Sequence, residues 1–165
     1  MRGDRLSGNA GSRVRLRHDG PVVAAKLGLD ALGFHDLVAY GAESTPVAVH
    51  LLIDTGATDS FIEQPVISLL NLPPSGRQTV FMADYQRRVC PVYSAMVYVP
   101  LEGPGGSHME PFPVRLLGIP APSRPDLAQR TFCGILGRDF LEHFFFGYDG
   151  PSGRFELRLP PDRPR

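Results

Sequence analysis

The chain has 165 residues, enough for one domain with a buried core and too few for two independent ones. Its 17 Lys and Arg residues balance 17 Asp and Glu residues, so charge gives no indication of binding to nucleic acid or to an anionic membrane. The 18 glycines and 17 prolines fall between short apolar runs, which favours short strands and turns over long helices.

Both ends of the chain are predicted as flexible tails, residues 1–20 and residues 161–165, around one folded domain at 21–160. The basic start is followed by no apolar segment of the secretory type, and no uncharged run is long enough to span a bilayer. We therefore expect a cytoplasmic protein that does not contact a membrane. An organelle transit peptide is the alternative, although Asp4, Asp19 and the lack of an amphipathic pattern argue against it.

Short apolar runs predict seven or eight strands. In chain order they cover residues 21–29, 35–42, 46–54, 78–83, 89–101, 109–118, 144–149 and 155–159. The sequence "GPSG" between the last two is typical of a hairpin turn, and segments 102–108 and 121–131 are predicted as loops. This many short strands predict an all-β barrel or sandwich.

Two stretches have helical features. Residues 63–72 place Pro65 in a first turn and apolar residues behind it, before two prolines end the pattern. Residues 137–145, "GRDFLEHFF", place Phe140, Leu141 and Phe144 at helical spacing, although this segment could instead begin a strand. One or two short helices are therefore expected.

Asp54 is the most informative residue of the chain. The preceding run "VAVHLLI" predicts a strand buried on both faces, and an acid at the end of a buried strand needs groups that satisfy it. Gly56 allows a sharp turn that brings backbone N–H groups toward the carboxylate, while Thr55 can bond locally or to another copy and Ala57 leaves room for a ligand. An isolated D-T-G tripeptide is also common in ordinary turns, where the Asp only caps the turn.

Two blocks in order, "LLIDTGATDSFI" (51–62) and "GILGRDFLEHF" (134–144), resemble the retropepsin-like aspartic proteases. The resemblance implies a retropepsin-like acid-protease barrel, all-β with one or two short helices and homodimeric. It also implies an aspartic endopeptidase that needs no metal or cofactor. The extra C-terminal hairpin is closer to bacterial and cellular members than to viral ones, and the polar turn at 83–88 suggests a different closure and specificity from the viral enzymes.

The resemblance implies a homodimer because the family chemistry needs two aspartates that face one water. This chain has one D-T-G and no D-S-G. The expected active site therefore lies at a two-fold axis where Asp54 of each copy meets. Two close carboxylates share a proton, so activity is expected at acidic to mildly acidic pH.

Further site residues follow from the same resemblance. Family members carry an Asp directly after D-T-G-A that binds the substrate backbone and pairs with the Arg of the second block. Here Thr58 occupies that position, so Asp59 could take over the task, and Arg138 could reach Asp59, a group on the second subunit or only solvent. Gly137, Arg138 and Asp139 are expected to support the loop and the dimer, with Asp139 able to cap backbone N–H groups.

The family also has a hairpin, the flap, that closes over a bound peptide. Its best candidate is "TVFMADYQRRVCPVY" (79–93), which lacks the glycine-rich tip of viral flaps. The predicted substrate contacts on it are Met82, Ala83, Asp84 and Tyr85. Each of them could instead be part of a solvated turn.

Other chemistries have little support in the sequence. The five histidines are scattered without paired spacing, and His50 is expected to be a core residue of its strand. Cys90 and Cys133 have no zinc-type spacing and are expected to be reduced thiols, and neither Ser60 nor Cys133 has a defined histidine partner for nucleophilic catalysis. Phe144 to Phe146 are expected to lie in the core or the dimer interface.

Two functions remain open. The first is an endopeptidase acting on a peptide or protein substrate, and the second is a non-catalytic peptide-binding or dimerisation module on the same fold. The intact D-T-G-A favours the enzyme. The sequence does not identify the substrate.

Overall fold

A computed structural model describes residues 5–7, 20–29, 45–103, 106–121 and 132–160. The strands are β1 (Arg5–Ser7), β2 (Val22–Leu29), β3 (Val47–Ile53), β4 (Ser60–Glu63), β5 (Gly76–Phe81), β6 (Arg87–Gly103), β7 (Gly106–Ile119), β8 (Gly134–Leu136), β9 (Phe145–Asp149) and β10 (Arg154–Arg158). The helices within these ranges are α3 (Gln64–Leu70) and α5 (Arg138–Leu141).

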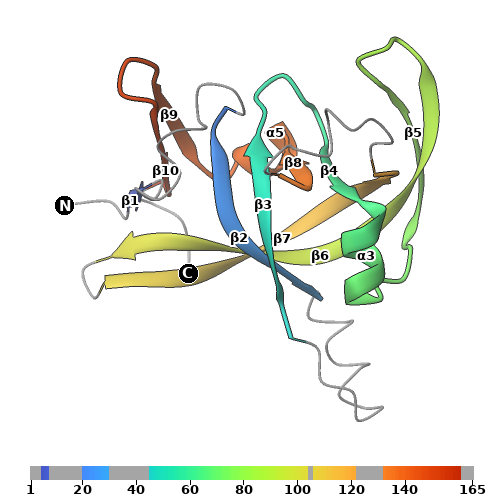
Figure 1. The fold of residues 1–165 in the computed structure, drawn as a ribbon, viewed down its shortest axis with the longest axis horizontal. Coiled ribbons are helices and arrows are strands. Elements are labelled where there is room, and N and C mark those ends of the chain that lie inside the picture. The colour runs from blue at the N-terminus through green and yellow to red at the C-terminus, as the bar shows by residue number, and fades with distance from the viewer. Residues whose placement is uncertain (1–4, 8–19, 30–44, 104–105, 122–131, 161–165) are drawn as a thin grey trace.

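Six strands close into a barrel (Figure 1). The hydrogen-bonded order is β2, β3, β8, β4, β7 and β6, and β6 pairs with β2 again. Most neighbours are antiparallel, but β8 runs parallel to β3 and β4 runs parallel to β7. The all-β barrel with two short helices that the sequence predicts is confirmed.

The barrel strands are buried on one face. Along β3, Val49 and Ile53 point into the core whereas His50 is exposed, as expected when one face of a strand lines the barrel and the other faces outward. The prediction that this strand is buried on both faces is wrong, and so is the prediction that His50 is a core residue. Both errors come from reading an apolar run as a central strand, while Ala48 and Leu52 lie on the outer face.

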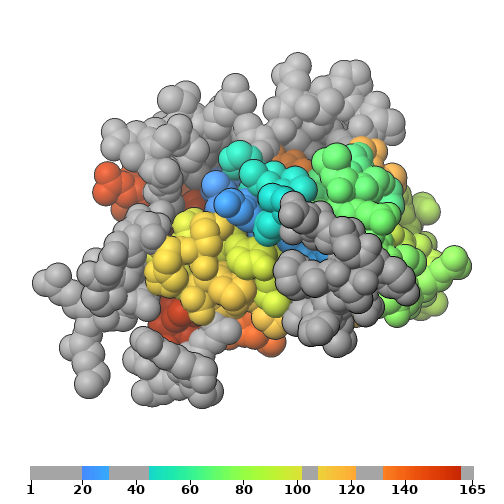
Figure 2. All heavy atoms as spheres, turned by 90° about the horizontal axis from the view of Figure 1, so that it is seen from below, coloured from blue at the N-terminus to red at the C-terminus, as the bar shows by residue number. Residues whose placement is uncertain are grey.

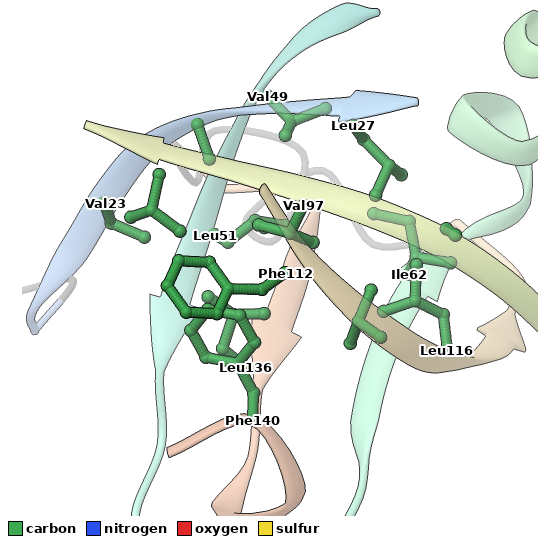
Figure 3. Packing of buried hydrophobic residues seen from close by; sticks show 14 of the residues in the cluster. Val23, Leu27, Val49, Leu51, Ile62, Val97, Phe112, Leu116, Leu136 and Phe140 are labelled. Atoms are coloured by element: carbon green, nitrogen blue, oxygen red, sulfur yellow. The ribbon is translucent and has the colours of Figure 1, made fainter. Parts of the chain in front are cut away.

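Aromatic packing links the barrel interior to α5. Phe112 of β7 and Phe140 of α5 are fully buried and meet edge to face, with ring centroids 5.8 Å apart. Phe144 lies 4.8 Å from Phe112 between centroids. Figure 3 shows Phe112, Leu136 and Phe140 stacked below Leu51 and Val97. The core therefore anchors the segment that follows β8.

The predicted strands at 21–29, 46–54, 78–83, 89–101, 109–118, 144–149 and 155–159 are confirmed, with shifts of a few residues at their ends. The segment predicted as a loop at 102–108 instead largely extends the β6–β7 hairpin. The predicted strand at 35–42 and nearly all of the predicted loop at 121–131 lie outside the described residues.

Three short strands in the described part of the chain were not predicted from the sequence. β1 lies within the predicted N-terminal tail, where its backbone pairs with β10 and with Glu102 of β6. β4 and β8 are four and three residues long, too short to show a period. Their pairing with each other and with longer strands, rather than local propensity, defines them.

The two helices are short and differ in their ends. α3 starts with Pro65 in its first turn and ends at Asn71, which has a left-handed φ of 50°. α5 has four residues, and β9 begins at Phe145, so the second predicted helix is a single turn followed by a strand.

Seen from below, β2 and β3 (blue and cyan) lie beside α3 (green) on the surface (Figure 2). Neither described helix has the length and apolar character needed to cross a membrane.

Candidate active site

Asp54 directly follows β3 and begins a tight loop. Its backbone N–H donates to the Leu136 carbonyl of β8 at 3.0 Å, and its own carbonyl accepts from Ala57 at 3.2 Å. The Gly56 N–H donates to Asp54 Oδ1 at 2.8 Å. The loop therefore turns back so that one of its own backbone donors holds the carboxylate, which is half-buried.

The glycine of D-T-G matches this geometry. A Cβ at Gly56 would lie 3.1 Å from Asp54 Oδ1, closer than a side-chain carbon normally approaches. A larger residue would press on the oxygen that Gly56 itself binds. The loop conformation and the orientation of the carboxylate thus depend on the same residue.

The second block of the sequence lies directly against this loop. β8 is inserted between β3 and β4, with Leu51 opposite Gly134 and Phe61 opposite Ile135. The Arg138 N–H donates to the Ala57 carbonyl at 2.9 Å, just beyond the end of β8. The two motifs that are some eighty residues apart in the sequence are therefore hydrogen-bonded neighbours in the fold.

Gly137 marks the closest approach of the two motifs. A Cβ there would lie 2.6 Å from the Asp59 carbonyl oxygen and 3.1 Å from that of Ala57. Real side chains essentially never approach a backbone atom so closely, so only glycine allows this packing.

Ser60 and Asp139 form a buried network under the loop. Ser60 is fully buried, its Oγ donates to Asp139 Oδ1 at 2.7 Å and its N–H donates to Asp139 Oδ2 at 3.0 Å. The Ser60 Oγ also accepts from the Gly137 N–H at 3.0 Å, and Asp139 Oδ1 accepts from the Phe140 N–H at 2.9 Å. Asp139 thus binds both the start of α5 and the start of β4.

Arg138 contacts Thr58 rather than Asp59. Its guanidinium donates to Thr58 Oγ1 at 3.0 Å, and the Asp139 N–H donates to the Thr58 carbonyl at 3.3 Å. Among the residues that the structure describes, Arg138 makes no hydrogen bond or ion pair with Asp59. The hydroxyl of Thr58 therefore receives the arginine where the family pattern has a carboxylate.

Asp59 points toward the other side of β4. Its Oδ1 accepts from Gln78 Nε2 of β5 at 3.2 Å and lies 3.7 Å from Arg115 NH1 of β7. Gln78 Oε1 in turn accepts from Arg115. We refer to Asp59, Gln78 and Arg115 as the polar triangle. Sequence reasoning missed Gln78 and Arg115, because only the pairing of β5 and β7 with the rest of the sheet places them beside Asp59.

The predicted flap is a hairpin of β5 and β6. Its turn is closed by the Met82 N–H donating to the Gln86 carbonyl at 3.0 Å, and Tyr85 is 94% exposed with a left-handed φ of 60°. Met82 is half-buried and packs against an apolar cluster of Val80, Cys90, Val92 and Leu117, whereas Ala83 and Asp84 are exposed. Figure 1 shows the hairpin tip rising at the same end of the molecule as the loop after β3.

Asp84 organises the hairpin turn. Its Oδ1 accepts from the Gln86 N–H at 3.1 Å, and its Oδ2 accepts from Arg88 at 2.7 Å. The Gln86 N–H, followed by the Arg88 guanidinium, lowers the pKa of the Asp84 carboxyl. Arg87 lies over the Phe81 ring, 4.9 Å from its centroid, on the other face of the hairpin.

The residues considered for metal binding or for a serine or cysteine nucleophile lie apart in the structure. No group of three metal-binding side chains occurs in the described part of the chain. Ser60 is buried in its network with Asp139, Cys90 is buried in the hairpin cluster with its thiol pKa raised by desolvation, and Cys133 is partly buried. Both cysteines are free thiols, as expected from their spacing.

The three consecutive phenylalanines differ in their environments. Phe144 is buried in the core, Phe146 is half-buried, and Phe145 is 56% exposed on β9. The core part of the expectation holds for Phe144, and Phe146 packs against the edge of the core, whereas Phe145 faces away because successive residues of a strand face opposite sides. That Phe145 lies in a dimer interface stays a prediction.

Comparison with known proteins gives structural neighbours at low identity. No family model and no curated protein matches the sequence. The chain is similar to the crystal structure of a retropepsin-like aspartic protease from Rickettsia conorii, with 13% identity and a TM-score of 0.44, over 94% of this chain and 89% of that one. It is also similar to the retroviral protease-like domain of Ddi1 from Leishmania major, with 13% identity and a TM-score of 0.38, over 86% of this chain and 96% of that one.

Proposed function

We propose that the protein is an aspartic endopeptidase that acts as a homodimer, with one Asp54 from each copy at the two-fold axis. The observation that carries this proposal is the loop itself. A half-buried carboxylate is held by the N–H of the glycine two residues on, and the loop is bonded to the second motif by Arg138. An ordinary turn would not need the inserted strand β8 or the close contact at Gly137.

The proposed reaction uses a water between the two carboxylates. The ionised Asp54 removes a proton from the water, which attacks the peptide carbonyl carbon, while the protonated Asp54 of the other copy donates its proton to the carbonyl oxygen. The Asp54 that took the proton from the water then gives it to the amide nitrogen, the C–N bond breaks, and the other Asp54 regains its proton from a hydroxyl of the intermediate as the product carboxyl forms. No covalent intermediate, metal or cofactor is required.

The proposed substrate is an extended peptide that lies between the D-T-G loop and the β5–β6 hairpin. Such a peptide is bound by its backbone hydrogen bonds, and its alternate side chains enter separate subsites. Met82, Ala83, Asp84 and Tyr85 are the hairpin residues proposed to cover it. No role for nucleic acid or a membrane is proposed.

The deciding experiment compares the wild type with Asp54→Asn on a library of peptides at acidic pH. The substitution keeps the side-chain size and removes the ionisable carboxyl, so cleavage is expected to fall about a hundredfold to ten-thousandfold, the range that acid–base catalysis contributes. Glu142→Gln, an exposed acid changed to its amide at the end of α5, is the matched control and should cleave like the wild type.

A statine-type transition-state mimic separates the enzyme from a non-catalytic module. An active site binds such a mimic far more tightly than the substrate, so the melting temperature of the wild type should rise with its concentration. Cleavage that survives Asp54→Asn would overturn the proposed mechanism. Peptide binding without cleavage and without a response to the mimic would favour the binding module.

A further inference from the structure

The polar triangle joins three elements next to the D-T-G loop. Asp59 directly precedes β4, Gln78 lies on the first strand of the hairpin, and Arg115 lies on β7. Gln78 donates to Asp59 and accepts from Arg115, so both polar ends of its amide are used. The catalytic loop and the base of the hairpin are therefore tied together by side chains as well as by the sheet.

The backbone on both sides of Asp59 is fixed. The Thr58 carbonyl accepts from Asp139, and the Ser60 N–H donates to the carboxylate of the same residue. The Asp59 carbonyl lies against Gly137. A side chain on so constrained a backbone holds its charge at a defined place, five residues beyond Asp54.

The charge of the triangle is balanced by a single residue. Asp59 carries a negative charge with 23% of its side chain exposed, and Arg115 carries a positive charge with 52% exposed, at 3.7 Å between NH1 and Oδ1. Gln78 is neutral. If Arg115 loses its charge, a net negative charge remains beside the loop, and if Asp59 loses its charge, a net positive one remains.

We propose that Arg115 is a specificity-determining residue, which neutralises Asp59 and so makes the subsite beside the D-T-G loop prefer an uncharged side chain of the substrate. This inference rests on the proposed function, because it places the peptide between the loop and the hairpin. A peptide in that position runs past the triangle, in which the hydrogen bond from Gln78 to Asp59 joins the hairpin side to the loop side. A lysine there competes with Arg115 for Asp59, and a glutamate competes with Asp59 for Arg115.

Binding measured by calorimetry tests the inference without relying on turnover. All proteins carry Asp54→Asn, so that bound peptides stay intact, and the peptides carry Gln, Lys or Glu at one position at a time on each side of the scissile bond. The variants are Arg115→Gln, Asp59→Asn, Arg115→Lys and Lys26→Gln. The last removes an exposed cation on β2, away from the triangle, and controls for the change in net charge.

In Arg115→Gln, the ratio of the affinity for the Lys peptide to the affinity for the Glu peptide should rise about fivefold, the size expected for a partly exposed ion pair. In Asp59→Asn, the same ratio should fall about fivefold. Both effects should be confined to one peptide position on each side of the cut and should shrink at high salt. Arg115→Lys and Lys26→Gln should leave the ratio of Lys-peptide to Glu-peptide affinity as it is in the protein that carries only Asp54→Asn.

A purely structural role of the triangle would weaken all peptides alike and leave the ratio of Lys to Glu unchanged, and this result would overturn the inference. Cleavage by the otherwise wild-type chain with the same preferences in Arg115→Gln would reject the inference while the proposed function stands. Absence of both cleavage and peptide binding would reject both.

Discussion

Gly137 lets the second motif, residues 134–144, pack closely against the loop that carries Asp54. It allows the Asp59 carbonyl to approach more closely than side chains essentially ever do, with the Ala57 carbonyl also close, and it lies next to the N–H of Arg138, which binds the Ala57 carbonyl. The position of Asp54 therefore depends on a glycine that carries no chemistry of its own. Its effect on stability and on activity should be inseparable.

Gly137→Ala is expected to lower the free energy of unfolding by about 2 kcal/mol or more, because the new methyl group must push backbone atoms apart. Cleavage should fall with it, since the loop that carries Asp54 must move. Urea unfolding and a peptide assay measure the two effects. Gly76→Ala, where an added Cβ meets nothing within 4 Å, is the control and should change stability by less than about 0.5 kcal/mol. Equal effects of both substitutions would contradict the contact argument.

Ser60→Ala is expected to cost about 1–3 kcal/mol of unfolding free energy. The substitution removes a fully buried hydroxyl that donates to Asp139 and accepts from Gly137, and it leaves that N–H without its partner. Ser68→Ala serves as the control, because the Ser68 hydroxyl is exposed and donates to the Gln64 carbonyl of its own helix. A loss no larger than that of Ser68→Ala in thermal or urea unfolding would show that water replaces the network.

At this scale the sequence predicted the loop better than its surroundings. The turn with its Gly56 N–H bound to Asp54 could be predicted, because the consecutive residues 54–57 carry the pattern, while their part in catalysis stays a prediction. The partner of Arg138 could not be predicted, since the choice between Thr58 and Asp59 depends on how the turn directs two adjacent side chains. Ser60 was considered only as a nucleophile, and its burial against Asp139 has no local sequence signal.

At the scale of elements, the shortest strands position the site. β8 has three residues, yet it separates β3 from β4 and binds the Asp54 N–H through Leu136. Long strands such as β6 and β7 could be predicted from their apolar runs, whereas β4 and β8 become strands only through partners far along the chain. Gly134 shows the same dependence, because a Cβ there would lie 2.6 Å from the Phe61 carbonyl.

The hairpin of β5 and β6 gives a prediction about pH. Because the pKa of Asp84 is lowered in the folded protein, its stabilising contribution is present above the unfolded pKa and is lost as pH falls through the folded one. NMR titration should show the Asp84 carboxyl titrating below its ordinary range. In Arg88→Gln its pKa should rise only partway, because the Gln86 N–H, the larger cause, remains. A full return to the ordinary value in Arg88→Gln would assign the shift to the ion pair instead.

At the scale of the molecule, three projections lie at one end of the barrel. Figure 1 shows the loop after β3, the tip of the β5–β6 hairpin and the turn between β9 and β10 at the same end. A second copy facing this end would bring its own Asp54 toward the first and place both hairpins around the site. Tyr85 at the hairpin tip, 94% exposed, and Tyr148 near the β9–β10 turn, 52% exposed, are among the large side chains that such a contact would cover.

Mixing wild type with Asp54→Asn tests whether two chains share one site. When equal amounts are unfolded in urea and refolded together, random pairing leaves about half of the wild-type chains in fully wild-type dimers, so activity per wild-type chain should fall to about half. A ninefold excess of Asp54→Asn should reduce it to about a tenth for the same reason. Peptide cleavage at fixed wild-type concentration measures this directly, because a dimer with one Asp54 lacks either the base or the acid.

Glu142→Gln in place of Asp54→Asn controls for dilution and refolding yield. Mixed dimers with this variant keep both aspartates, so activity per wild-type chain should not fall at any ratio. Unchanged activity in the Asp54→Asn mixtures after refolding would mean that each chain works alone, which a single D-T-G cannot support by a two-carboxylate mechanism. The dependence of activity on the mixing ratio thus counts the aspartates in the working site.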